Sequence, residues 1–92
     1  MPEKEIKETL KIQNKHGLHA RPAALLVKAA AKFKSNIKIS KDGLIVNGKS
    51  ILGVMTLAAE FGSEIEIIVN GDDAEEALAA IKNVIEGKFE EE

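Results

Sequence analysis

Hydrophobic and polar residues alternate in four short stretches of this chain and recur at helical spacing in three others. Alternation is typical of a strand with one buried face, whereas recurrence every three or four positions is typical of a helix with one apolar stripe. The pattern predicts the order β-α-β-β-α-β-α. Strands are expected at residues 5–13, 36–41, 44–46 and 64–69. Helices are expected at residues 20–33 and 51–59, and a third helix should begin at residue 72 or 73, with an apolar stripe that ends at Ile85.

Local signals indicate where the helices begin and end. Pro22 is tolerated in the first turn of a helix, so the first helix should open at His19 or Ala20. Ser50 is a natural N-cap for the second helix, and Gly62 should end it. The closing residues 88–92 are expected to form a frayed, solvated tail.

The second helix carries more apolar residues than one buried stripe requires. A sufficient core face follows the spacing i, i+3, i+4, i+7: Val54, Leu57, Ala58 and Phe61. This leaves Ile51, Leu52 and Met55 as a second apolar stripe, which suggests a docking patch. The alternative is that this short helix is buried all round.

Strands with one polar face and helices with one apolar stripe fit a sheet that is covered on one side only. The chain is therefore expected to belong to the α+β class, with helices on one face of an antiparallel sheet. Its 92 residues are too few for two independent cores, so we expect one domain over residues 1–92.

Composition excludes several function classes. The 13 Lys and Arg against 15 Asp and Glu give a formal charge of −2, so no overall positive field attracts nucleic acid or anionic membrane. Three Phe, without Trp or Tyr, argue against base-stacking platforms and a deep aromatic pocket. No apolar run approaches the ~20 residues of a membrane span, and the first residues are too polar for a signal peptide. We expect a cytoplasmic protein without nucleic-acid partners or membrane insertion.

His16 and His19 are the two histidines of the chain and admit three interpretations. They could be solvent-facing loop residues without a role. They could bind a metal as a pair three residues apart, although no further ligand follows at a suitable spacing. In the third interpretation, His19 opens a helix whose unpaired N–H groups and partial charge of about +0.5 attract a phosphoryl group. Arg21 would add donors for the phosphoryl oxygens, and the imidazole of His19 would be the nucleophile.

Two further features admit both a structural and a functional interpretation. Ser50 is most simply a helix cap, but phosphorylation there would add a charge of about −1.5 to −2 near the docking patch. The non-core face of the first helix carries basic residues beside small alanines: Ala20, Arg21, Ala24, Lys28 and Lys32. This face is either ordinary solvated surface or a contact for an acidic partner.

Two motifs together resemble one family. GLHARPA at residues 17–23 resembles the active-site signature of the HPr family of phosphocarriers of the bacterial phosphotransferase system. KSILGVMTL at residues 49–57 resembles the regulatory-serine segment of that family, in the form typical of Gram-positive bacteria. The similarity runs from the first strand to the last helix, and the two motifs stand about thirty residues apart, as in the family.

The resemblance implies an open-faced β-sandwich with strand order 1-4-2-3 and three helices on one face. It implies that His19 accepts a phosphoryl group on Nδ1 from phospho-Enzyme I and passes it to IIA domains of sugar permeases, with Arg21 as the neighbouring phosphate partner. It implies ATP-dependent modification of Ser50 by HPr kinase/phosphorylase, and binding of the phospho form to a catabolite-control repressor. Docking would involve Ala20, Ala24, Lys28, Ile51, Leu52 and Met55. A carrier of this kind is not an enzyme; we expect a monomer without cofactor or metal.

The chain departs from the family pattern at three places. His16 stands where members usually carry Asn or Ser, the N-terminus is a few residues longer than typical, and the acidic residues 90–92 are not part of the pattern. The interpretations of the two histidines and of Ser50 leave three functions open: a phosphoryl carrier acting through His19, a regulatory domain acting through Ser50 and its neighbouring patch, and a metal-binding domain.

Overall fold

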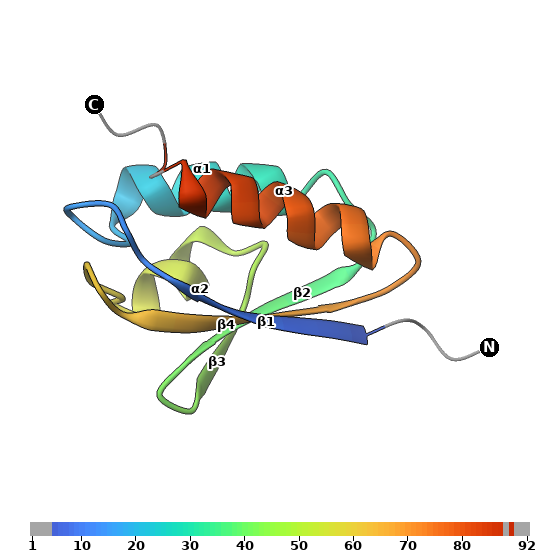
Figure 1. The fold of residues 1–92 in the computed structure, drawn as a ribbon, viewed down its shortest axis with the longest axis horizontal. Helices are drawn as coiled ribbons and strands as arrows, with labels where there is room; N and C mark the ends of the chain where they lie inside the picture. The colour runs from blue at the N-terminus through green and yellow to red at the C-terminus, as the bar shows by residue number, and fades with distance from the viewer. Residues whose placement is uncertain (1–4, 88, 90–92) are drawn as a thin grey trace.

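Four strands form one antiparallel sheet, and three helices lie over one face of it (Figure 1). The computed structural model describes residues 5–87 and residue 89. The elements follow the predicted order: β1 (Glu5–Lys11), α1 (Ala20–Ala30), β2 (Asn36–Lys41), β3 (Leu44–Asn47), α2 (Ile51–Thr56), β4 (Glu64–Asn70) and α3 (Ala74–Glu86).

The sheet order is β1-β4-β2-β3, with neighbouring strands antiparallel. This confirms the α+β class and the strand order that the resemblance implies. β4 lies inside the sheet between β1 and β2, and its Ile65, Ile67 and Val69 are all buried. β3 is an edge strand, and its Leu44 and Ile45 are exposed.

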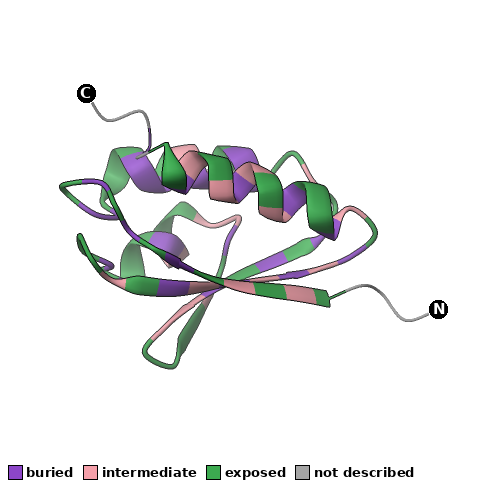
Figure 2. Ribbon diagram, in the orientation of Figure 1, coloured by how far each residue is buried: buried purple, intermediate pink, exposed green. Residues whose placement is uncertain are grey.

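The core fills the space between the sheet and the helices (Figure 2). The inward positions of β1, β2 and β4 meet one stripe of α1 and one of α3, as the hydrophobic pattern predicted. From α1 the fully buried residues include Ala23, Leu26 and Ala30, and from α3 they include Ile81 and Ile85. The opposite face of the sheet stays open to solvent.

Asp73 ties two loops together at the end of α1 that is farther from His19. Its carboxylate accepts hydrogen bonds from the backbone N–H groups of Lys34 (2.8 Å) and Ser35 (3.0 Å) and from the Ser35 hydroxyl. These hydrogen bonds, with that from the Ser35 side chain foremost, lower the pKa of Asp73 below its usual value of 3.8. The loop before β2 is thereby fixed to the start of α3.

The second helix is shorter than predicted, and its expected core face is partly wrong. Val54 and Leu57 are buried, but α2 ends at Thr56, and Ala58 takes a left-handed backbone with φ 51°. The chain therefore leaves the helical path, Ala58 is exposed and Phe61 is 67% exposed. The helical spacing that placed Phe61 in the core does not apply beyond Thr56.

The first helix is also shorter than predicted and ends at Ala30 rather than near Phe33. The amides of Lys32 and Phe33 donate to carbonyls three residues earlier, the tighter pattern of a closing turn. Ala31 is the C-cap residue of α1. Phe33 remains half-buried outside the helix and packs against the core.

Phe89 contradicts the expectation of a solvated tail. Its ring is 2% exposed and belongs to the core cluster, against the ends of α1 and α3. An aromatic ring gains free energy by covering apolar surface that the short helices leave open. The other residues of the expected tail, Lys88 and residues 90–92, lie outside the described residues.

Candidate functional site

The loop before α1 is held in a defined shape by a neighbouring loop. Leu18 is buried, and its N–H donates to the carbonyl oxygen of Ala59 (2.8 Å), in the loop after α2. Gly17 has φ 74°, and a Cβ there would overlap the Ala59 carbonyl oxygen and approach the Cα of Glu60 to 2.9 Å. Glycine is required at this position on both counts.

Asn14 contributes to this loop and is not among the site residues predicted from the sequence. It is 2% exposed, and its Nδ2 donates to the carbonyl oxygen of Gly17 (2.8 Å), whose own N–H donates back to the Asn14 carbonyl (3.3 Å). An asparagine just before a turn often bonds to backbone two or three residues on, and this was the available signal. The two bonds fix the path that leads to His19.

His19 is the N-cap residue of α1, as predicted, with an extended backbone (φ −88°, ψ −167°). Its carbonyl accepts the first helical hydrogen bond, from the amide of Ala23 (2.9 Å). Within the part of the chain that the structure describes, the imidazole makes no capping hydrogen bond, and the residue is exposed. The first-turn amides of Ala20 and Arg21 precede that helical bond, and Pro22 has no N–H. The ring is thus presented to solvent at the positive end of a helix dipole.

The second histidine lies close to the first. The ring centroids of His16 and His19 are 5.7 Å apart, and the rings meet edge to face. Residues 5–87 and 89 contain no group of three or more His, Cys, Asp or Glu side chains able to hold a metal ion. The structure therefore brings the two imidazoles together without the additional ligands that a metal centre requires.

Ser50 caps α2, as predicted. Its hydroxyl accepts a hydrogen bond from the amide of Gly53 (3.0 Å), and the residue is half-buried. The apolar stripe that follows is exposed, with Ile51 at 44%, Leu52 at 78% and Met55 at 37%. The alternative in which this helix is buried all round is wrong, and the exposed stripe is the patch predicted from the surplus of apolar residues.

α1 and α2 lie side by side and run in opposite directions. Lys49, just before α2, donates from Nζ to the carbonyl oxygen of Phe33, just after α1 (2.7 Å). At the other end, Leu18 bonds to Ala59. Ser50 therefore lies at the far end of the helix pair from His19, separated by a six-residue helix about 9 Å long. The stripe of Ile51, Leu52 and Met55 runs between the two.

The outer face of α1 is exposed where the sequence predicted a solvated or docking face. Ala20, Arg21, Ala24 and Lys28 all lie on this surface. Arg21 stands two residues after His19 in the first turn, and Lys28 two turns further on. The face combines small side chains, which permit close approach, with positive charge.

An exposed imidazole at the start of a helix, on an open-faced sandwich of four strands and three helices, is the arrangement expected of a small phosphoryl carrier. The sequence model for the phosphorylation site of the HPr component of the phosphotransferase system matches residues 6–87. The chain belongs to the HPr family of phosphocarriers.

Relatives and solved structures agree with this assignment. The chain is 51% identical over 85 residues to the phosphocarrier protein HPr of Treponema pallidum, covering 92% of this chain and 97% of that protein. It is 47% identical to the HPr-like protein Crh of Halalkalibacterium halodurans, over 88% of this chain and 96% of the relative. The fold is similar to the crystal structure of HPr-C-His from Thermoanaerobacter tengcongensis, with a TM-score of 0.91 and 49% identity over 95% and 98% of the two chains.

Members of the family carry phosphoryl groups within the phosphotransferase system, where they act with Enzyme I and IIA domains. They are carriers with a phosphohistidine intermediate, not catalytic enzymes. None of the helices in residues 5–87 is long and apolar enough to cross a membrane.

Proposed function

We propose that His19 is the residue that carries the phosphoryl group. The exposed imidazole at the positive end of α1 is the observation that carries the proposal. Unpaired first-turn amides and a partial positive charge of about +0.5 favour a bound phosphoryl group. The buried anchors at Asn14, Gly17 and Leu18 hold the loop, so the backbone that presents the ring is fixed before the reaction.

The transfer exchanges one nitrogen–phosphorus bond for another. A ring nitrogen of neutral His19, Nδ1 by analogy with the family, attacks the phosphorus of phospho-Enzyme I. The bond to the Enzyme I imidazole breaks, and that imidazole leaves with the electron pair. Arg21 contributes N–H donors that stabilise the charge on the phosphoryl oxygens during both transfers. The same exchange then passes the group to a IIA domain, and no water is consumed.

The docking surface in this proposal joins two helix faces. Ala20, Ala24 and Lys28 of α1 would meet acidic partner surface, and Leu52 and Met55 of α2, together with Ile51, would meet an apolar one. Enzyme I and the IIA domains would use this surface in turn. In the proposal residues 1–92 act as one HPr-like domain, a monomer in the cytoplasm, because the relay starts from the cytoplasmic metabolite phosphoenolpyruvate.

The test is incubation with phosphoenolpyruvate and Enzyme I, followed by intact mass and acid treatment. The parent should gain one phosphoryl group that acid removes, because phosphohistidine is acid-labile. His19→Ala should gain none while remaining folded, since the residue is exposed and outside the core. His16→Ala is the matched control and should gain one group like the parent. Phosphate uptake by His19→Ala would refute the assignment.

We further propose that Ser50 is a regulatory site. Its hydroxyl already caps α2, and a phosphate there would remain at a helix start, where negative charge is tolerated. The charge would lie beside the exposed stripe of Ile51 and Leu52, and would oppose an acidic partner on the adjacent α1 face. HPr kinase/phosphorylase would add this phosphate, and a catabolite-control repressor would bind the product.

Ser50→Asp tests the electrostatic part of this regulation. Asp is itself a good N-cap, so the helix should persist. We expect uptake from phospho-Enzyme I to slow by about threefold or more at low salt, with a smaller effect at high salt. Ser50→Asn is the control, because it caps equally well without charge. Equal rates for the Asp and Asn variants would argue against the mechanism.

A further inference from the structure

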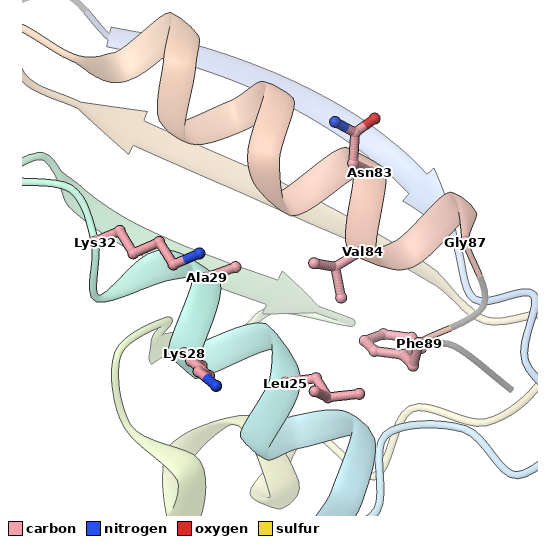
Figure 3. A pocket seen from close by; sticks show the side chains of 8 residues that line it. All are labelled: Leu25, Lys28, Ala29, Lys32, Asn83, Val84, Gly87 and Phe89. Atoms are coloured by element: carbon pink, nitrogen blue, oxygen red, sulfur yellow. The ribbon is translucent and has the colours of Figure 1, made fainter.

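A groove between α1 and α3 adjoins the proposed docking surface and shares Lys28 with it (Figure 3). It encloses about 380 Å³, which falls within the range of small-molecule sites. Leu25 and Ala29 contribute from α1, Val84 from α3, and Phe89 closes one end. The side chains of Leu25 and Val84 converge on the Phe89 ring (Figure 3). The groove therefore has an apolar floor that the rest of the core does not fill.

The rim of this groove is positive. Lys28 lines it from the last turn of α1 and Lys32 from the turn that follows the helix, and both are exposed. No acidic residue lines the groove in the part of the chain that the structure describes. Nor is either lysine ion-paired with a carboxylate of residues 5–87. Two exposed cations therefore lie beside an apolar floor.

We propose that this groove binds a small organic anion with an apolar body, such as an aryl carboxylate or aryl phosphate. The body would displace water from the half-buried Leu25 and Val84, and the anionic head would meet Lys28 and Lys32. A bare phosphate ion would leave the apolar floor wet. Glutamate side chains, as in residues 90–92, carry the charge but offer little apolar surface to fill the floor.

Occupancy would affect the relay, and this part rests on the proposed function. Lys28 lies both on the groove rim and on the α1 face proposed to meet acidic partners. An anion held there neutralises part of that charge. Uptake from phospho-Enzyme I should then fall at low ionic strength, where electrostatic steering is strongest.

Binding is measured by titrating the full chain with phenyl phosphate and following backbone amides by NMR. We expect saturable shifts in α1 and α3 around the groove, with a dissociation constant of about 1 mM or tighter for so small a probe. Phenylacetate should bind at the same place. Benzyl alcohol lacks the anionic head, and inorganic phosphate lacks the apolar body. Both should bind at least several-fold more weakly.

Variants separate the groove from general attraction of anions. Lys28→Gln with Lys32→Gln should weaken phenyl phosphate about tenfold, whereas Lys11→Gln on the open sheet face should not. Val84→Phe fills the groove without changing charge and should abolish the shifts. Equal affinity for inorganic phosphate, or no effect of the two lysine substitutions, would overturn the proposal. So would shifts that map away from Leu25 and Val84.

A further experiment isolates the effect of the bound anion on phosphoryl transfer. Saturating phenyl phosphate should slow uptake from phospho-Enzyme I at least twofold in the parent and leave the Val84→Phe variant unaffected. Inhibition of both would place the effect on Enzyme I and refute the coupling. If the chain took up no acid-labile phosphate at all, the proposed relay would fail, while the NMR titration would still decide the binding site. A last comparison uses the full chain and a chain that lacks residues 90–92. If only the shorter chain bound phenyl phosphate, residues 90–92 would be the occupant of the groove and the proposal would be overturned.

Discussion

Gly17→Ala is the substitution whose effect the structure defines most sharply. Gly17 has φ 74°, and an added Cβ would overlap the carbonyl oxygen that accepts the hydrogen bond from Leu18. Because the atoms that the Cβ meets all belong to the backbone of Ala59 and Glu60, no side-chain rotation relieves the clash. The loop must move, and His19 is two residues away.

The magnitude follows from two contributions. A left-handed backbone costs an alanine about 1–2 kcal/mol, and displacing the buried bond between Leu18 and Ala59 adds about 1 kcal/mol. We expect Gly17→Ala to lower the free energy of unfolding by about 2–3 kcal/mol, which corresponds to roughly 10–20 °C in Tm for a domain of this size. Uptake of phosphate from phospho-Enzyme I should also slow, because the loop that presents the imidazole is displaced.

Gly43→Ala is the matched control. Gly43 has φ 87°, yet a Cβ there finds no atom of the described residues within 4 Å, so only the backbone strain of about 1–2 kcal/mol remains. The effect of alanine on the unfolded chain is common to both variants and cancels in the comparison. Urea titrations of both variants, with single-turnover uptake measured on folded protein, provide the assay. If Gly17→Ala costs no more stability than Gly43→Ala, the reasoning is refuted.

Two further predictions concern stability. Phe89→Ala should lower the free energy of unfolding by about 3–5 kcal/mol in a urea titration, because a buried ring is removed. Phe61→Ala, at a 67% exposed position, is the control and should change it by no more than about 0.5 kcal/mol. Similar losses for both variants would contradict the burial of Phe89. Asp73 has a lowered pKa in the folded chain, so its carboxylate contributes stability that is present above its ordinary value of 3.8 and is lost as pH falls through the lower folded value. The stability difference between the parent and Asp73→Asn should be constant from pH 7 to 5 and narrow below about pH 4. A difference that stays unchanged from pH 5 to pH 2.5 would show that charge is not the cause.

The sequence predicted the elements and the candidate site well where the signals are local. Alternation and helical spacing gave seven elements in the right order, and the caps at His19 and Ser50 are where proline and serine preferences placed them. The exposed stripe of α2 followed from counting apolar residues. Each of these signals acts within one or two turns of chain, so a single sequence contains it in full.

Two errors concern the burial of aromatic rings. Phe61 continues a helical pattern, but the left-handed Ala58 turns the chain, and the ring ends in solvent. Phe89 stands in a charged terminal stretch, yet the gap left between α1 and α3 takes it into the core. Periodicity reports which residues share a face only while the element continues, and it contains nothing about gaps between elements.

The sequence by itself determined the α+β class, the starts of the helices and the residue types that suit phosphoryl transfer, because propensity, capping and periodicity depend on near neighbours. Only the tertiary structure decided how His19 is presented, how far Ser50 lies from it and where the apolar groove opens. Those properties depend on the contact of Leu18 with Ala59, on the antiparallel packing of α1 and α2, and on Phe89 between α1 and α3. Each contact joins residues far apart in the chain, and their free energy of association exists only when the whole core has formed.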